Sequence, residues 1–150
     1  MVDILLDSTF LLPTFGVEVE DIGADDLKTL KDSSKKVGLY CSYVSFVEIL
    51  GKLARNSTES NFEAIDLAIR SLLESGTYGW VNPSAKAIAL AFELRTKGHR
   101  DNIDNILYST ALDAGMRFLS MDEELKDFLS RKGYNTKIMI GVKQLKSEAR

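Results

Sequence analysis

Several carboxylates in this sequence follow or adjoin short apolar runs that lie far apart along the chain. Two like charges about 5 Å apart repel each other by about 3 kcal/mol at an effective dielectric constant of about 20, so a fold gathers such groups only for a reason. The usual reason is a divalent cation, and a site built only of oxygen ligands favours Mg²⁺ or Mn²⁺. The candidate metal ligands are Asp7, Glu48, Asp104 and Asp122, with Asp101 as a further acid.

A site of this kind is suited to the hydrolysis of phosphodiester bonds. Two ions about 4 Å apart can hold the attacking and leaving oxygens of a phosphate. A metal ion also lowers the pKa of a bound water, which can then attack the phosphorus without a covalent intermediate. The pattern is compatible with one ion or with two.

An open α/β sheet would bring these acids together. Helical segments separate the strand-like segments and are long enough for parallel crossovers. Ligand sites in such sheets lie outside the carboxyl ends of the strands, where Asp7, Ser120 and Asp122 are expected. The predicted strands are residues 4–6, 37–42, 78–81, 117–120 and 136–140, and the predicted helices are 24–36, 44–55, 60–75, 84–97, 102–114, 122–132 and a short one within 142–150.

Local signals predict where two of these helices begin and which faces point inward. Ser60 followed by Glu63 is a capping box that opens the helix over 60–75. Asn82 and Pro83 predict the N-cap and the first residue of the next helix. The expected inward-facing residues are Val44, Val47, Leu50 and Leu53 in the helix over 44–55, and Ile88 and Ala91 with Leu94 or Phe92 in the helix over 84–97.

Composition limits the class of protein. The 150 residues are 45% hydrophobic and 27% charged, which excludes a disordered chain and predicts a single domain over residues 1–150. The net charge of −3 argues against broad attraction to nucleic acid, so any RNA contacts must come from locally gathered cations. The candidates are Lys52, Arg55, Arg95, Lys97 and Arg100, whose alternative is an ordinary place at helix ends and in exposed loops.

The scarcity of cysteine and histidine excludes other chemistry. With Cys41 and His99 as the single residues of their types, the chain has no disulfide framework, cysteine-based zinc site or paired-histidine relay. The sequence contains no run of about 18 apolar residues, the length needed to span a membrane. The first residues also lack the features of a signal peptide. We therefore expect a cytoplasmic protein with no membrane contact.

Four segments, in this order, resemble the PIN-domain family, whose best-known members are metal-dependent ribonucleases, including the toxins of VapBC toxin–antitoxin pairs. The resemblance extends from Ile4 to about Phe128. The segments are Ile4-Leu5-Leu6-Asp7-Ser8-Thr9-Phe10-Leu11, Ser45-Phe46-Val47-Glu48-Ile49-Leu50, Asp104-Asn105-Ile106-Leu107-Tyr108-Ser109-Thr110-Ala111-Leu112 and Phe118-Leu119-Ser120-Met121-Asp122.

The resemblance implies a three-layer α/β/α fold with a central parallel sheet and hydrolysis of RNA with one or two Mg²⁺ or Mn²⁺ ions. It also implies a homodimer and, for the toxin class, an antitoxin partner. The chain departs from the family in the bulky Tyr108 and in the long acidic segment from Thr14 to Asp26. By resemblance the metal-site acids are Asp7, Glu48, Asp104 and Asp122, and Ser8 or Ser120 orients a carboxylate or a metal-bound water.

Each acid also has a purely structural interpretation. Asp7 can end a strand in a turn, and Glu48 can form an ion pair with Lys52 or Arg55. Asp104 can be an ordinary acid of a first helical turn, and Asp101 and Asp122 can be N-caps. At the level of function, the alternatives are a catalytically silent PIN-fold binding module and a receiver-type signalling domain. A receiver requires adjacent acids after the first strand and a lysine after a late strand, but Asp7 is followed by Ser8 and no such lysine follows Ser120.

Overall fold

The apolar run at the start of the chain forms the middle strand of a five-stranded sheet. In the computed structural model, which describes residues 1–56 and 61–149, β1 (Asp3–Leu6) pairs with β2 (Gly38–Ser42) on one side and with β4 (Arg117–Leu119) on the other. With β3 (Gly79–Val81) and β5 (Met139–Ile140), the order is β3-β2-β1-β4-β5 and every pairing is parallel. The predicted parallel sheet is therefore confirmed.

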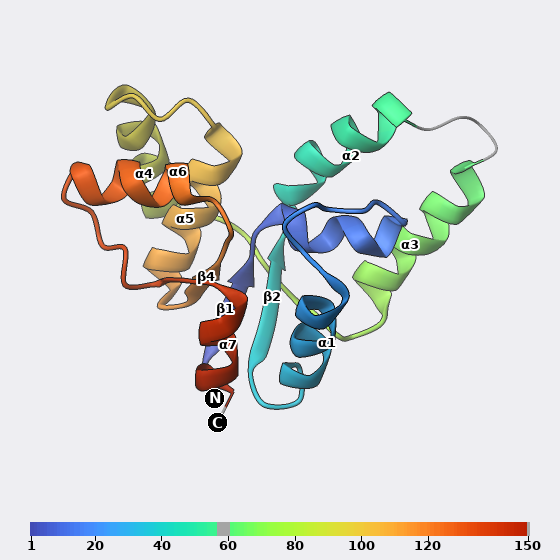
Figure 1. Cartoon of the computed structure of the whole chain (residues 1–150). Helices are drawn as coiled ribbons and strands as arrows, with labels where there is room; N and C mark the ends of the chain where they lie inside the picture. The colour runs from blue at the N-terminus through green and yellow to red at the C-terminus, as the bar shows by residue number, and fades with distance from the viewer. Residues whose placement is uncertain (57–60, 150) are drawn as a thin grey trace.

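Helices cover both faces of this sheet. Successive side chains of a strand point to opposite faces, so an apolar strand such as β1 makes both faces apolar. Ile4 and Leu6 of β1 join one apolar cluster and Leu5 joins the other. Figure 1 shows α1–α3 on one side of the sheet and α4–α6 on the other. The first cluster includes residues of the 3₁₀-helix η1 (Ser8–Phe15), α1 (Ala24–Ser33), α2 (Ser45–Asn56), α3 (Phe62–Glu74) and α7 (Val142–Glu148), and the second those of α4 (Ala85–Thr96), α5 (Asn102–Ala114) and α6 (Glu123–Arg131). The three-layer α/β/α fold is confirmed.

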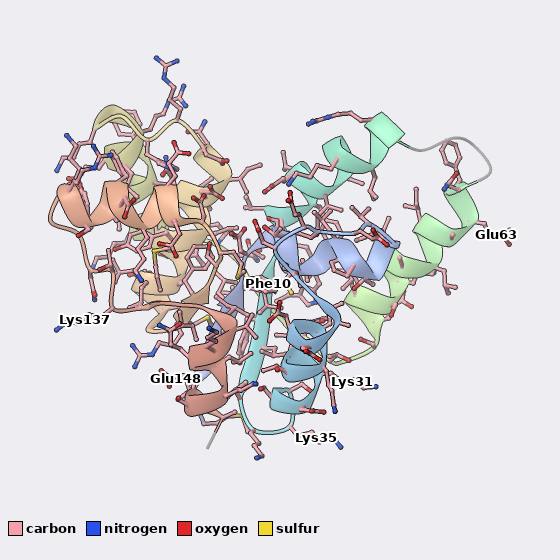
Figure 2. The ribbon with its side chains drawn as sticks, viewed as in Figure 1. Phe10, Lys31, Lys35, Glu63, Lys137 and Glu148 are labelled. Atoms are coloured by element: carbon pink, nitrogen blue, oxygen red, sulfur yellow. The ribbon has the colours of Figure 1, made fainter. Side chains whose placement is uncertain are left out.

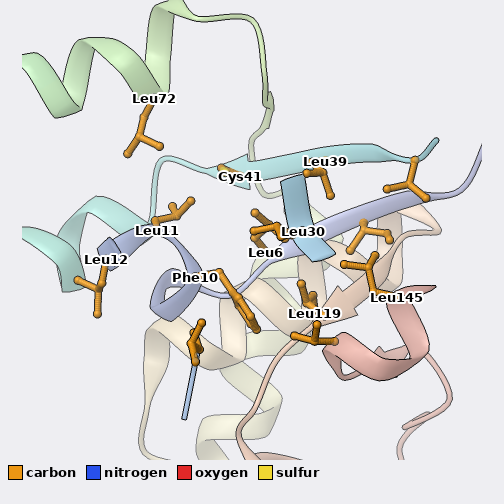
Figure 3. Close-up of a cluster of buried hydrophobic side chains, with 14 of the residues drawn as sticks. Leu6, Phe10, Leu11, Leu12, Leu30, Leu39, Cys41, Leu72, Leu119 and Leu145 are labelled. Atoms are coloured by element: carbon orange, nitrogen blue, oxygen red, sulfur yellow. The ribbon is translucent and has the colours of Figure 1, made fainter. Parts of the chain in front are cut away.

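The 3₁₀-helix η1, which no sequence pattern predicted, directs the chain from β1 into the core. Gly16 ends it at a φ of 77°, a left-handed conformation that glycine adopts without steric cost. Figure 2 shows the side chain of Phe10 inside the molecule, whereas Lys31 and Lys137 extend from its outline. Figure 3 shows Phe10, Leu11 and Leu12 packed among leucines of the sheet and the surrounding helices.

The inner face of α2 differs from the prediction. Ile49 and Leu53 are buried, whereas Val47 and Leu50 are exposed. Two rows of apolar residues on this helix have helical spacing, Phe46, Ile49 and Leu53 in one and Val47 and Leu50 in the other. The sequence pattern alone therefore cannot show which row faces the core. Packing against η1 and the sheet selects the first row. The second remains on the surface.

The start and inner face of α4 also need correction. Its N-cap is Ser84, whose Oγ accepts a hydrogen bond from the Ala87 N–H at 3.0 Å, so the predicted start at Asn82 and Pro83 is wrong. Ile88 and Phe92 are exposed, because the row of Ala87, Ala91 and Leu94 faces inward and α4 packs closely on α5.

The ends of two other segments are also informative. The predicted capping residue Ser60 lies outside the described residues. The last strand is shorter than predicted, because the Met139 N–H donates to the Thr136 carbonyl in a turn and only Met139–Ile140 pair with β4. Among residues 1–56 and 61–149, no helix has both the length and the apolar character that a bilayer span requires.

Candidate metal centre

The carboxyl ends of the strands bring the predicted acids to one edge of the sheet. The chain leaves β1 and β2 toward the region between α2 and α5 (Figure 1). Asp7 follows β1, Glu48 lies in the first turn of α2, and Asp104 lies in the first turn of α5. One carboxylate oxygen from each of these residues lies within 4.8 Å of the other two. This spacing allows the three side chains to ligate one cation.

These three acids line a cavity of about 270 Å³. Asp101 and Asp122 line it, so all five predicted acids border the same space. Asp21 is a sixth acid at its wall, and sequence reasoning missed it as a site residue. The available signal was the acidic character of the segment from Thr14 to Asp26. The other lining residues are Thr9, Val19, Ile22 and Met121.

Asp7 is held in place from the neighbouring strand. Its backbone N–H donates to the Leu119 carbonyl at 3.0 Å, and the Ser120 hydroxyl donates to Asp7 Oδ2 at 2.8 Å. Burial raises the pKa of Asp7 to about 6, the charge of Glu48 adds to this effect, and the Ser120 hydrogen bond opposes it. Ser120 also accepts a hydrogen bond from the Asp122 N–H at 3.1 Å, so one hydroxyl joins two of the acids.

The environment of Asp104 opposes ionisation more strongly. Burial, the negative charge of Asp7 and a hydrogen bond with Asp122 together raise its pKa to about 9. The side chain is only 8% exposed. A divalent cation would offset the negative charges of the ionised carboxylates. Because the donor atoms are all oxygens, the site fits Mg²⁺ or Mn²⁺.

Glu48 uses its two oxygens differently. Oε1 forms an ion pair with Lys52 Nζ at 2.8 Å, so Lys52, and not Arg55, is its partner. Oε2 is buried and has no hydrogen-bond partner among the described residues. A buried carboxylate oxygen without a partner is costly, and a cation ligated there would remove that cost. The ion pair and a ligand role are therefore compatible.

The two acids interpreted as helix caps have that role in the structure. Asp101 Oδ1 accepts from the Asp104 N–H at 3.0 Å, and Asp122 Oδ1 accepts from the Leu125 N–H at 2.9 Å. Each carboxylate nevertheless lines the cavity. Ser8 is buried, and its Oγ has no partner among the described residues, so Ser120 is the serine that orients Asp7.

Within residues 1–56 and 61–149, four of the five predicted RNA-binding residues form no ion pair with the acids of the cavity. The Arg95 guanidinium donates to the Arg100 carbonyl, and the Lys97 ammonium lies 5.0 Å from the centre of the Tyr134 ring. Arg55 and Arg100 are exposed. Lys52, through its pair with Glu48, is the one cation of the set placed directly at the acid cluster in the described part of the chain.

A buried amide fixes the loop that leads into α5. Asn105 Nδ2 donates to the His99 carbonyl at 2.8 Å, and Asn105 Oδ1 lies 2.8 Å from His99 Nδ1. Since the amide oxygen can only accept, His99 Nδ1 must carry the proton. This pair of contacts ties residues 99–101, including Asp101, to the helix that carries Asp104.

Replacing Ser120 with Ala is expected to weaken Mn²⁺ binding by about 10- to 100-fold, the usual cost of losing a group that orients a metal ligand. Without the hydroxyl, Asp7 loses its hydrogen bond and its pKa rises further. Calorimetric titration with Mn²⁺ measures the effect, and Ser120→Thr, which keeps the hydroxyl, is the control. Unchanged affinity in Ser120→Ala would show that this hydrogen bond does not orient a ligand.

Comparisons with known proteins give a family match and solved structures of similar fold. A model of the PIN domain matches residues 4–128. A search of curated proteins found no match. VapBC2 from Rickettsia felis, bound to a promoter DNA fragment, is similar with 17% identity and a TM-score of 0.64, over 93% of this chain and 98% of that chain. PAE2754 from Pyrobaculum aerophilum has 18% identity and a TM-score of 0.62, over 99% and 97% of the two chains. A toxin–antitoxin complex from Klebsiella pneumoniae has 13% identity and a TM-score of 0.60, over 93% and 97%.

Proposed function

The chain belongs to the PIN-domain family, and from this premise we propose that it is a metal-dependent ribonuclease that hydrolyses phosphodiester bonds of RNA. The observation that supports this most is the approach of the Asp7, Glu48 and Asp104 carboxylates to within 4.8 Å in a cavity at the strand ends. Family membership argues against a receiver-type domain. The silent binding module is the alternative that the experiment below distinguishes.

In this proposal Asp7, Glu48, Asp104 and Asp122 hold one or two Mg²⁺ or Mn²⁺ ions, and Asp101 adds to the negative wall of the cavity. When bound, the cation lowers the pKa of water and offsets the charge that develops on the phosphate. Asp104, which its raised pKa keeps protonated at neutral pH, gives up its proton when the cation binds, so binding releases a proton. Ser120 keeps the Asp7 carboxylate oriented during the reaction.

The RNA backbone requires cations near this acidic cavity. We assign this role to Lys52, Arg55, Arg95, Lys97 and Arg100. Lys52 is the nearest to the acids through its 2.8 Å pair with Glu48, and a phosphate entering the cavity would share its ammonium group. The other four would contact phosphates further along the strand.

Two protein partners follow from the family. Solved structures of similar fold include toxin–antitoxin complexes, so we propose that this chain is the toxin of such a pair and acts in the cytoplasm.

We also propose a homodimer, since α4 exposes Ile88 and Phe92, 46% and 70% accessible, four residues apart on one helix. Sedimentation equilibrium of the purified chain tests the dimer, and a monomer at micromolar concentration would contradict it.

The cleavage experiment uses end-labelled single-stranded RNA with Mg²⁺, Mn²⁺ or EDTA. We expect cleavage with either ion and none in EDTA. Because water, and not the ribose 2′-hydroxyl, is the proposed nucleophile, the products should carry no 2′,3′-cyclic phosphate. Cleavage that persists in EDTA or yields cyclic ends would contradict the mechanism. Metal binding without any cleavage would favour the silent module.

A further inference from the structure

An aromatic stack lies at the carboxyl end of β2, outside the residues that line the acid cavity. The Tyr43 ring stacks on the Trp80 ring with centroids 5.0 Å apart and an angle of 28° between the planes. Phe46 stacks on the same indole at 5.6 Å and 9°. Tyr43 is 50% exposed, so much of its ring surface remains open to solvent.

The sheet and the first apolar cluster hold Trp80, the central ring of the stack. Trp80 lies in β3, paired in register with the buried Cys41 of β2, and it packs against the first apolar cluster. Its indole N–H is buried and has no hydrogen-bond partner among the described residues, so ring contacts hold it. The contact with Trp80 therefore restrains the Tyr43 ring on one side, which lowers the entropy cost of stacking another planar group on it.

The position of Tyr43 along the sheet connects it to the acids. Because β1 and β2 are parallel neighbours, Asp7 after β1 and Tyr43 after β2 both follow the carboxyl ends of their strands. Glu48 follows Tyr43 five residues later on α2. The exposed ring and the acid cavity thus lie at the same edge of the sheet.

We propose that Tyr43, supported by Trp80, stacks an unpaired base of the RNA strand whose phosphate occupies the acid cavity. This inference rests on the proposed ribonuclease function, and it requires the stacked base to be unpaired, because a paired base is not free to stack on a protein ring. The chain carries a net charge of −3, so electrostatic attraction to RNA is weak and a non-ionic contribution to binding is needed. Stacking supplies it without regard to base identity.

The alternative occupant of this surface is an apolar segment of a partner protein, because Val47 and Leu50 are exposed on the same helix as Phe46. The base is favoured by the flat ring stacked on Trp80 and by its place at the same end of the sheet as the cavity that would hold the phosphate. The experiment separates the two, since only a base-stacking role makes RNA affinity depend on Tyr43.

Trp80 is the single tryptophan of the chain, so its fluorescence reports directly on the stack. Ten-residue uridine and adenosine oligoribonucleotides are titrated into the protein in Ca²⁺ at low salt, so that a cation held by oxygen ligands occupies the acid cavity, and each strand is checked for cleavage on a gel. An abasic ribose-phosphate strand of the same length is the ligand control. We expect the base-bearing strands to change the Trp80 emission and the abasic strand to bind about 5- to 100-fold more weakly.

The variants isolate the ring. Tyr43→Leu should lose about 5- to 100-fold in affinity for the base-bearing strands, whereas Tyr43→Phe, which keeps the ring, should bind within about twofold of wild type. Phe62→Leu, at an exposed phenylalanine on α3, should bind as wild type. Melting curves check that each variant is folded.

Wild-type affinity in Tyr43→Leu, equal binding of the abasic strand, or no RNA binding by the wild type would each overturn the stacking proposal. The ribonuclease proposal is judged separately. If Tyr43→Leu cleaves with an unchanged KM, the nuclease stands and the stack fails. If the wild type binds in a Tyr43-dependent way but never cleaves with Mn²⁺, the stack stands and the nuclease fails.

Discussion

Asp104→Asn is expected to lower metal-dependent RNA cleavage by more than about 100-fold while raising the stability of the metal-free protein. Loss of groups that only orient a metal ligand costs about 10- to 100-fold, so loss of a ligand oxygen should cost at least as much. The stabilisation has a separate cause. The folded state holds Asp104 at a pKa of about 9, so at pH 7 it must keep a proton that the unfolded chain releases, and an amide avoids that cost.

Cleavage rates in Mn²⁺ and melting curves in EDTA measure the two effects on the same preparations. Asp32→Asn is the matched control, since it changes the same group at an exposed position of α1. A variant that still cleaves, or that melts below the wild type in EDTA, would contradict the assignment of Asp104 to a repulsive metal cluster.

The metal-free protein is expected to lose stability as the pH rises from about 4 to about 9. Asp7 and Asp104 both have folded-state pKa values above the ordinary value of 3.8. The folded state therefore binds more protons than the unfolded state in this range, and the stability these groups contribute at low pH is lost as each folded pKa is passed. Asp7 alone accounts for about 3 kcal/mol between pH 4 and 6.

Urea unfolding in EDTA at pH 5, 7 and 9 measures this slope. The double variant Asp7→Asn with Asp104→Asn should show a much flatter dependence, because both titrating groups are gone. Saturating Mn²⁺ should likewise remove much of the slope in the wild type by favouring the ionised carboxylates. A wild-type stability that rises or stays level with pH in EDTA would refute the pKa assignments.

The sheet and the acids at its edge were predictable because short-range patterns carry them. The run Ile4-Leu5-Leu6 is apolar on both faces, as a central parallel strand requires, and Asp7 closes it. The Ser120–Asp122 spacing likewise indicated a strand end. The hydrogen bond between Ser120 and Asp7, however, joins residues 113 positions apart, and no local pattern shows which oxygen the hydroxyl contacts.

The features that the sequence did not predict depend on tertiary contacts. Asp21 lies in a segment with no helical or strand periodicity, and only the path of the chain after η1 brings it to the cavity. On α2, Val47 has the spacing of a core residue but is exposed, because the neighbouring row that contains Ile49 fills the space against η1. Tyr43 was not singled out, since its importance comes from Trp80 on a different strand.

Calorimetric titration of Mn²⁺ into wild type and Asp104→Asn at pH 7.5 tests the central claim, that these acids form a metal centre. We predict saturable binding of one or two ions to the wild type, with heats that depend on the buffer because protons are released, and greatly weakened binding to Asp104→Asn. At a hundredfold excess over the dissociation constant, Mn²⁺ should stabilise the wild type by about 2.7 kcal/mol. No binding heat and no change in stability of the wild type would contradict the account.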